Sequence, residues 1–401
     1  MLELEEAQHR ILSRIKPLPS ETVSLGRSCG RTLAEDIPAP LDLPPFDNSA
    51  MDGYALRAAD TTGACAERPV SLSVIGTTPA GTAFGGEVTA GTCVRLFTGS
   101  PMPKGADAVV MQEDTRLDLA TADRVWLLDS AKPWENVRFR GEDVKQTQVL
   151  ASAGECLTPG RIALLAAVGR GDVLVGRRPS VGLIATGSEL REPGQPLEPG
   201  EIYESNRASL AALVSQAGGI PKIFPLARDH LEVIRSLVDQ ALSECDVVIT
   251  SGGVSVGEWD LVKKALEGAG GELEYWGVAI KPGKPFVFGA RQGKLLFGLP
   301  GNPVSAFVTF LLLARAALLK LQGAKSWQLA SHPGVLGEPI ANRGERRHFV
   351  RVIVEGNGEV RSAGLQGSHI LRSLAQADGL IDVPSGSSWR AGEKVTVLRW
   401  G

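Results

Sequence analysis

The chain has 401 residues, enough for two to four domains with cores of their own, and 43% of them are hydrophobic, as in ordinary globular proteins. Its formal net charge is −3 and it has no dense basic run, so a nucleic-acid partner is not expected. Five scattered cysteines without a CxxC pair argue against a structural zinc site and a disulfide framework, and they favour a reducing compartment.

The N-terminal region predicts a helix followed by extended and β structure. Leu4, Ala7, Ile11 and Ile15 recur at helical spacing, which indicates a helix over residues 2–16 that is acidic and unlike a signal peptide. A second short helix is expected near residues 30–36. Four prolines within residues 38–45 exclude helix and inner strand, so this stretch is a stiff connector. Short β runs separated by Gly, Pro and Thr then predict an all-β domain from about 69 to 128.

The C-terminal half predicts alternating strands and helices. A helix at 160–170 and a strand at 173–178 precede this pattern. Further strands are expected at 180–186, 220–225, 246–250, 273–280, 286–289 and 295–298, and helices at 207–217, 231–242, 260–267 and 303–321. Such alternation predicts a doubly wound parallel sheet. After residue 326 the sequence returns to β runs, which predict a small β-barrel or sheet.

No membrane segment is expected. The longest apolar tract, residues 307–319, is short for a membrane span and contains Arg315, so a core helix is the better interpretation. Together with the absence of a signal-peptide pattern, this predicts a cytoplasmic protein.

A glycine-rich turn follows the strand at 246–250. Its residues Ser251-Gly252-Gly253-Val254-Ser255-Val256-Gly257 would place bare backbone N–H groups and hydroxyls at the carboxyl edge of the sheet, where open α/β folds bind ligands. The turn matches neither the dinucleotide fingerprint nor the Walker loop. Taken alone, it is equally consistent with a tight strand-to-helix connection that needs small residues.

Three acidic side chains follow strands of the same predicted sheet. Glu189, Asp229 and Asp260 lie in turns that leave strands, and such turns meet at one edge of a parallel sheet. Carboxylates at a phosphate site commonly hold Mg²⁺. The alternative for Asp229 and Asp260 is a helix N-cap, which explains an isolated aspartate more often.

Two further turns predict an anion site at this edge. Lys281 and Lys284 in KPGKP form a proline-stiffened cationic clamp, or else a solvated surface turn. In the stretch from Pro300 to Ser305, Asn302 suits an N-cap and Pro303 the first helical position, so the helix N-terminus and Ser305 would face the same space. A capped core helix is the alternative.

Other polar residues carry little information by themselves. Asp52, Thr98 and Asp143 lie in turns outside the α/β region, and periodicity does not place them near the site. His369 is more often a hydrogen-bonded turn residue than a base. The arginines at 343, 346, 347 and 351 are more consistent with a solvated face than with a basic edge.

Several segments together resemble one family, the molybdopterin molybdenumtransferases, which include bacterial MoeA and the gephyrin E domain. They are PFDNSAMDGYA (45–55), LFTGSPMPKGADAVVMQE (96–113), RGED (140–143), TGSEL (186–190), SGGVSVGEWD (251–260), KPGKP (281–285), LPGNPVSA (299–306) and QGSH (366–369). The resemblance spans essentially the whole chain in one order.

The resemblance implies a multidomain fold of α/β and β parts. The expected domains are a discontinuous linker domain at 1–45 and 140–178, an inserted β domain at 46–139, a doubly wound, mostly parallel α/β molybdopterin-binding domain at 179–325, and a C-terminal β-barrel at 326–401. It also implies a homodimer whose site lies between the α/β domain of one subunit and the inserted domain of the other.

The implied reaction is Mg²⁺-dependent insertion of molybdate into adenylylated molybdopterin with release of AMP, which gives molybdenum cofactor. By resemblance, Glu189, Asp229 and Asp260 would hold the metal, and Asp52 and Asp143 would act from the partner subunit. The residues implied to bind substrate are Thr98, Ser251, Gly252, Gly253, Ser255, Lys281, Lys284, Pro300, Asn302, Pro303, Ser305, Arg351 and Ser368. For Arg351, a small register shift would substitute Arg346 or Arg347.

One departure and two alternatives remain open. Gly277 stands where some members of the family carry a lysine, so one positive charge is missing. A molybdopterin adenylyltransferase has a similar α/β domain but needs no inserted or barrel domain. The other alternative hypothesis is a gephyrin-like scaffold without enzymatic activity. Contacts with the adenylyltransferase and with molybdoenzyme apoproteins are further expectations.

Overall fold

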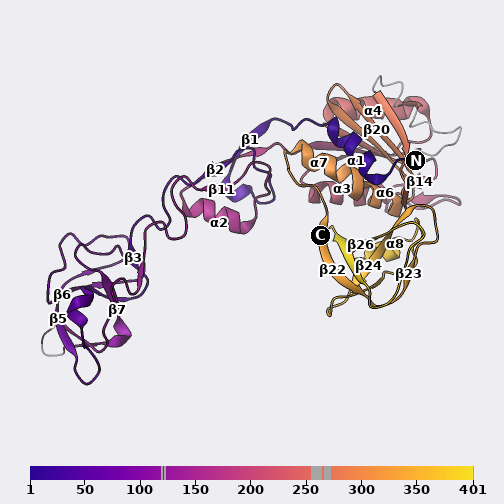
Figure 1. Cartoon of the computed structure of the whole chain (residues 1–401). Coiled ribbons are helices and arrows are strands. Elements are labelled where there is room, and N and C mark those ends of the chain that lie inside the picture. Colours follow the sequence, from indigo (N-terminus) through magenta and orange to yellow (C-terminus); the bar gives the residue numbers. More distant parts are fainter. Residues whose placement is uncertain (119–120, 122, 254–263, 266–271, 401) are drawn as a thin grey trace. The chain divides into compact units, whose positions relative to one another are not determined.

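The computed structural model describes residues 1–118, 121, 123–253, 264–265 and 272–400. The chain divides into two compact units, drawn in sequence colours in Figure 1. One unit comprises residues 1–35, 153–158 and 172–401, and the other comprises residues 36–152 and 159–171. Each is described by itself.

The larger unit contains a mostly parallel sheet. Among the described residues its strand order is β16 (Ile220–Ile223), β13 (Ser180–Ala185), β17 (Val247–Ser251), β21 (Lys294–Leu299), β20 (Pro285–Arg291) and β18 (Glu272–Gly277). The first four strands are parallel, whereas β20 is antiparallel to both of its neighbours. The sheet is therefore mostly parallel, as expected, and β20 is the strand that departs from the parallel series. Because β20 is antiparallel to both β18 and β21, these two strands run in the same direction.

Helices cover both faces of this sheet, as Figure 1 shows. Side chains alternate along β13: Val181 and Leu183 pack in a core with α1 (Leu4–Ser13), α3 (Asn206–Gln216), α6 (Pro303–Thr309) and α7 (Arg315–Leu321), whereas Ile184 packs against α4 (Leu231–Glu244). Burial on both faces explains why these strands read as continuous apolar runs.

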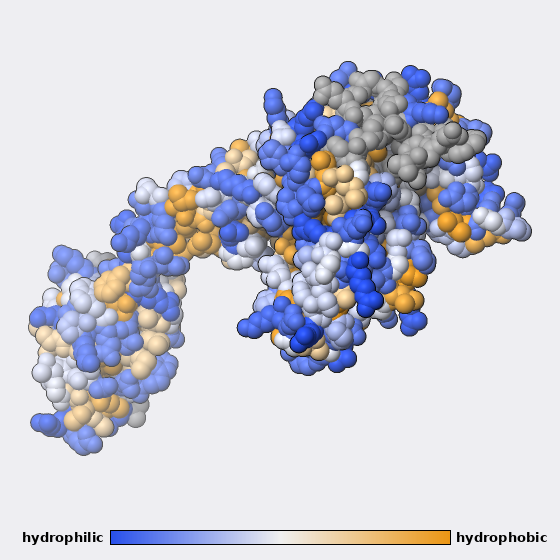
Figure 2. All heavy atoms as spheres, turned by 45° about the vertical axis from the view of Figure 1, so that its right-hand side comes forward, coloured by the Kyte–Doolittle hydropathy of each residue, from blue (hydrophilic) through white to orange (hydrophobic). Residues whose placement is uncertain are grey.

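The apolar helical stretch Pro303–Leu321 is long and apolar enough to cross a membrane by length and composition, but 78% of its most apolar window is buried inside the protein. A core helix passes the same test. Residues Phe310–Ala314, between α6 and α7, form a π-helical turn. The face of the molecule in Figure 2 is mostly polar, with small hydrophobic patches.

The predicted helix near residues 30–36 is wrong. These residues instead form isolated β-bridges, Thr32 with Cys156 and Leu33 with Val175, and Gly30 has a φ of 75°. The nearest helical turn is the 3₁₀ segment Leu25–Arg27, which follows β1 (Ser20–Ser24). Strand β1 pairs with β12 (Asp172–Gly176).

A closed β-barrel follows the α/β region. Strands β24 (Arg347–Val354), β25 (Glu359–Ser362), β22 (Ala330–Leu336), β28 (Lys394–Arg399) and β26 (Gly379–Val383) pair in this order, and β26 pairs back to β24. The short strand β19 (Ile280–Lys281) pairs with the start of β24. The barrel thus continues directly into the turn that carries the predicted lysine clamp.

The smaller unit is built on a β-sheet with the order β7 (Ala108–Met111), β4 (Gly53–Leu56), β6 (Thr92–Leu96), β5 (Val70–Thr78), β9 (Arg124–Leu127) and β8 (Thr115–Leu117). Tyr54, Leu72 and Val125 are buried in its core. This unit also contains α2 (Pro159–Ala167) and two strand pairs: β3 (Asn48–Ser49) with β10 (Val137–Arg138), and β2 (Ile37–Pro38) with β11 (Val149–Ala151). Its sheet agrees with the β domain expected from the sequence.

Candidate active site

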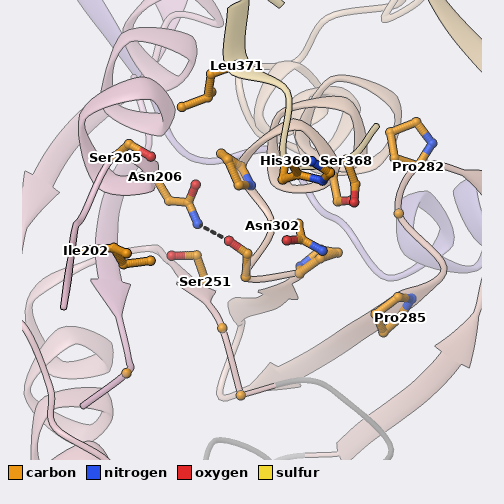
Figure 3. Close-up of a pocket in the computed structure, with 18 of the residues that line it drawn as sticks. Ile202, Ser205, Asn206, Ser251, Pro282, Pro285, Asn302, Ser368, His369 and Leu371 are labelled. Atoms are coloured by element: carbon orange, nitrogen blue, oxygen red, sulfur yellow. Dashed lines mark hydrogen bonds between the residues drawn. The ribbon is translucent and has the colours of Figure 1, made fainter. Parts of the chain in front are cut away.

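A cavity of about 1180 Å³ opens at the carboxyl edge of the α/β sheet. Turns that follow β13, β17 and β21 line it, together with the start of α3, the turn before β20 and a turn of the barrel (Figure 3). The predicted site residues that line it are Glu189, Asp229, Ser251, Gly252, Gly253, Lys281, Lys284, Pro300, Asn302, Pro303, Ser305 and Ser368. The structure therefore brings most of the sequence-predicted set to one place.

Gly252 allows three of these turns to pack together. Its φ is 93°, and a Cβ atom built on it would lie 2.7 Å from the carbonyl oxygen of Thr186. On its other side, the Gly252 N–H donates to the carbonyl oxygen of Leu299 at 3.2 Å. Only glycine combines this backbone conformation with so close an approach, so the glycines of the turn serve packing as well as ligand access.

The lysine turn is held by the barrel and by α6. Strand β19, which includes Lys281, pairs with β24, and Nη1 of Arg346 donates to the carbonyl oxygen of Ile280 at 2.9 Å. Gly283 has a φ of 110°, and a Cβ there would lie 2.3 Å from Oγ1 of Thr309 on α6. These contacts place Lys281, Lys284 and Arg346 on one side of the cavity.

Helix α6 begins as the sequence predicts, with Asn302 before it and Pro303 in its first turn. One of its N-terminal donors is already engaged: the Val304 N–H donates to the carbonyl oxygen of Ser368 at 3.2 Å. Ser305, which is 5% exposed, lines the cavity beside this contact. The partial positive charge of the helix N-terminus thus adds to that of the three cations.

The nearby positive charges affect the pKa of His348. This side chain is 7% exposed, and its Nε2 atom has no hydrogen-bond partner. Burial, and after it the charges of Lys281, Arg351 and Arg346, together lower its pKa to about 4. His348 is therefore neutral at pH 7 beside this group of cations.

Acidic residues line the cavity at the tips of β13 and β16. The Ser188 N–H donates to Oδ2 of Asp229 at 3.0 Å. Gly187 leaves room for the carboxylate of Glu189, since a Cβ atom on Gly187 would lie 2.6 Å from Oε2 of Glu189. Neither carboxylate forms an ion pair with any residue that the structure describes. Asp260 and Ser255, also predicted for the site, lie outside the described residues.

Arg351 is not among the residues that line the cavity, but its Nη1 atom is buried without a hydrogen-bond partner among the described residues, so the expectation that it contacts the bound anion stays a prediction. Its side chain is 0% exposed, and its guanidinium donates to Ser373 Oγ and to the carbonyl oxygens of Leu365 and Gly367. Burial lowers its pKa to about 10. Arg346, which the sequence left as an alternative, occupies the cavity wall instead. Arg347 turns to Glu5 and Asp382.

Three family models match the chain in succession. They are the MoeA N-terminal region (domain I and II) over residues 2–169, a probable molybdopterin binding domain over 182–320, and the MoeA C-terminal region (domain IV) over 333–400. The molybdopterin molybdenumtransferase of Haemophilus influenzae is 38% identical over 99% of this chain and 98% of that protein. The chain belongs to the molybdopterin molybdenumtransferase family.

Similarities to a second relative and to a solved structure agree with this family assignment. Molybdopterin molybdenumtransferase 2 of Mycobacterium tuberculosis is 39% identical over 96% of each chain. The crystal structure of the molybdopterin biosynthesis MoeA protein from Pyrococcus horikoshii OT3 matches with a TM-score of 0.84 and 35% identity, over 99% of this chain and 100% of that one. The predicted family, the α/β-plus-β fold and the class of enzyme, a transferase of molybdenum cofactor biosynthesis, are thereby confirmed.

Sequence reasoning missed one wall of this transferase's cavity, the residues around the start of α3. Ile202 and Tyr203 form β15, and with Glu204 and Asn206 they line the cavity. Glu204 accepts hydrogen bonds from the backbone N–H groups of Asn206 and Arg207. The sequence does contain a signal for this wall. Glu204 is a carboxylate just before the start of a helix, which is typical of capping, and it follows a turn at the same edge of the sheet.

Three site residues implied by the family lie in the smaller unit. The backbone N–H and hydroxyl of Thr98 both donate to Oδ1 of Asp52, at 2.7 and 2.8 Å, and these two bonds hold the pKa of Asp52 below its usual value. Asp143 is exposed. Asp52 and Thr98 thus form one local cluster of this unit, with a carboxylate that is ionised at neutral pH.

Proposed function

We propose that the chain inserts molybdenum from molybdate into the dithiolene of adenylylated molybdopterin and releases AMP, in a reaction that requires Mg²⁺. The single observation that carries this proposal is the division of the cavity, with Lys281, Lys284 and Arg346 on one wall and the unpaired carboxylates of Glu189 and Asp229 on another. An oxyanion and a metal–phosphate group would each find suitable partners within one cavity.

The cationic wall serves to bring anions together. Molybdate and the substrate's phosphates are negatively charged, and they repel one another at the short distance that transfer requires. Lys281, Lys284, Arg346 and the N-terminus of α6 offset this repulsion, and Ser305 and Ser368 supply hydroxyl donors. A fixed set of donors also holds the reactants in a productive orientation.

The acidic wall fits Mg²⁺. This ion binds through one or two carboxylates and retains waters and phosphate oxygens as its other ligands. Glu189 and Asp229 are free of ion pairs with described residues. The described residues contain no group of three acidic, His or Cys side chains that could hold a metal ion, so the two carboxylates need a further ligand. Asp260 is the third proposed ligand. When bound, the ion would neutralise charge on the phosphoanhydride and ease the departure of AMP.

We further propose that a homodimer completes the site, with Asp52, Thr98 and Asp143 supplied by the partner subunit. In the smaller unit, Asp52 lies in a segment with exposed hydrophobic side chains that a partner would cover: Phe46, Met51, Phe97 and Phe139 are 43%, 42%, 37% and 42% exposed. Figure 2 shows hydrophobic patches on this unit. Asp52 would then act on metal, water or substrate across the interface.

The expected setting is the cytoplasm, with product passed to molybdoenzyme apoproteins and substrate received from molybdopterin adenylyltransferase. The decisive experiment mixes purified protein, adenylylated molybdopterin, Mg²⁺ and molybdate, and it measures AMP together with reconstitution of an apo-molybdoenzyme. Both should appear. AMP without active cofactor would mean that the chain hydrolyses the substrate but does not insert the metal. A parallel reaction with tungstate measures the choice of metal.

Variants separate the roles of the two units. Asp260→Ala and Asp52→Ala should abolish turnover and leave the dimer intact, as judged by light scattering. Asp239→Ala is the control, since this residue lies on α4 and pairs with Arg291 away from the cavity. Near-normal turnover of Asp260→Ala would refute its assignment. Mixed dimers of the Asp52 and Asp260 variants should regain part of the activity, because one of their two sites is intact.

A further inference from the structure

Three polar atoms at the carboxyl edge of the sheet are buried without a hydrogen-bond partner among the residues that the structure describes. They are Oγ1 of Thr186, Oγ of Ser251 and Oδ1 of Asn206, and these residues are 5%, 2% and 8% exposed. All three line the cavity, where we call them the polar floor. A buried polar atom without a partner costs about 1–3 kcal/mol, so three of them in one cavity indicate a ligand that supplies the missing hydrogen bonds.

The contacts of Asn206 determine what that ligand must offer. Its Nδ2 donates to the carbonyl oxygen of Gly301 at 2.8 Å, and because a carbonyl oxygen only accepts, this bond settles which amide atom is the nitrogen. The amide oxygen is directed away from Gly301 (Figure 3) and can only accept. The hydroxyls of Thr186 and Ser251 can donate or accept. A ligand bound here therefore needs at least one N–H or O–H group to satisfy Asn206.

Ile202 supplies an apolar surface beside the polar floor. It is 55% exposed although it lines the cavity. Its place is fixed by the pairing of β15 with β14 (Leu190–Arg191) and by its N–H, which donates to the carbonyl oxygen of Glu189 at 2.9 Å. In Figure 3, the side chain of Ile202 and the hydroxyl of Ser251 point toward each other below Asn206. An aliphatic side chain next to a few polar atoms suits a flat ring whose edge carries N–H groups.

We propose that the polar floor binds the edge of a flat nitrogen heterocycle of the substrate. Oδ1 of Asn206 accepts a hydrogen bond from the exocyclic amino group of the ring, and Ile202 covers one face of the ring. The inference rests on the proposed function, because adenylylated molybdopterin contains two rings of this kind, a pterin and an adenine. The side chains of the floor are uncharged, so they suit a neutral ring, whereas the cationic and acidic walls suit the charged groups of the substrate.

The test compares ligands that differ by one amino group. Titration calorimetry on the full-length protein measures the dissociation constants of AMP and of purine riboside monophosphate, which lacks the amino group of adenine. A second pair consists of pterin and its analogue without the amino group. In one pair the amino-bearing ligand should bind about tenfold more tightly, from one added hydrogen bond, and that pair identifies the ring. Equal affinities within both pairs would overturn the inference.

Asn206→Ala should reduce this preference to about one, because the amino group loses its acceptor. If Asn206 served only to link α3 to Gly301, the variant would weaken the binding of both ligands of a pair by the same factor and keep the preference. A preference that persists in Asn206→Ala would therefore overturn the inference.

A variant at an exposed position covers the case in which Asn206→Ala unfolds. Ile202→Ala should weaken the binding of the preferred ring ligand by about fivefold, from lost apolar contact, and leave the binding of inorganic phosphate unchanged. Ile223→Ala is the matched control, since this isoleucine is also 55% exposed but lies on β16 outside the cavity lining. Unchanged ring binding in Ile202→Ala would overturn the inference.

The same measurements separate this inference from the proposed function. A protein that shows the amino preference but releases no AMP from adenylylated molybdopterin would keep the ring site and overturn the proposed reaction. A protein that makes active cofactor but shows no preference that depends on Asn206 would keep the reaction and overturn the ring site.

Discussion

Nδ2 of Asn206 donates to the carbonyl oxygen of Gly301 at 2.8 Å, and this bond ties the start of α3 to the loop before α6 (Figure 3). The two residues are 95 positions apart in the sequence. Asn206 is 8% exposed, and its Oδ1 has no hydrogen-bond partner. The bond therefore fixes the orientation of the amide and links two walls of the cavity.

Asn206→Ala should separate these walls. We expect a loss of about 1 kcal/mol in the free energy of unfolding, from one hydrogen bond, and a fall of about tenfold in the rate of AMP release, because small displacements of binding groups are costly in catalysis. Denaturant titration and the AMP assay measure the two effects. Ser215→Ala, an exposed position on the same helix, should change neither. Full activity in Asn206→Ala would show that the two walls need no such link.

Gly252→Ala should be strongly destabilising. The new Cβ would meet the Thr186 carbonyl oxygen, and the residue would keep a positive φ. Overpacking and backbone strain together predict a loss of about 2–4 kcal/mol in the free energy of unfolding. Gly293→Ala is the matched control, with a φ of 80° and nothing within 4 Å of the added Cβ, and it should cost only about 1 kcal/mol. Equal losses in the two variants would show that the close approach of the turns is unimportant.

Stability should depend on pH through His348. Its pKa is about 4 in the folded protein and ordinary when unfolded, so the unfolded chain binds more protons below pH 6.5. The free energy of unfolding should therefore fall as the pH falls from 6.5 to 4, by up to about 3 kcal/mol from this group. His348→Leu should remove this part of the slope in denaturation curves across that range. His332→Leu, at an exposed site, should leave the slope unchanged.

Glu189→Gln should weaken the proposed metal site. The variant keeps the shape of the side chain but loses its negative charge, so the Mg²⁺ concentration for half-maximal AMP release should rise by about tenfold. A magnesium titration at saturating substrate measures this. Glu232→Gln, an exposed change in the first turn of α4, is the control. An unchanged magnesium requirement would remove Glu189 from the ligand set.

Much of the cavity lining could be predicted from the sequence, because many of its residues lie in turns directly after strands. Once residues 180–186 and 246–250 are recognised as strands of a parallel sheet, the turns after them must share an edge, and Glu189 and Ser251 follow. The barrel strands were also evident from their β runs. These predictions needed only local periodicity and one rule of topology.

What the sequence did not reveal depends on contacts between distant residues. The reversal of β20 passes through Gln292 and Gly293, which have φ values of 51° and 80°, and such a two-residue turn is a hairpin signal that strand–helix alternation obscured. The position of Arg346 on the cavity wall depends on the pairing of β24 with β19: Arg346 precedes β24 and donates to the carbonyl oxygen of Ile280, whereas Arg351 is buried within β24. The role of Asp52 depends on the arrangement of two units.

The pairing of β19 with β24 has a consequence for biosynthesis of the protein itself. Strand β24 is completed only when β26 and β28 have joined the barrel, and β28 ends at Arg399. A ribosome-bound chain therefore lacks the finished wall that holds Lys281 and Arg346 until almost its last residue has been made. Unfinished copies would therefore have little capacity to hold an anion at this wall.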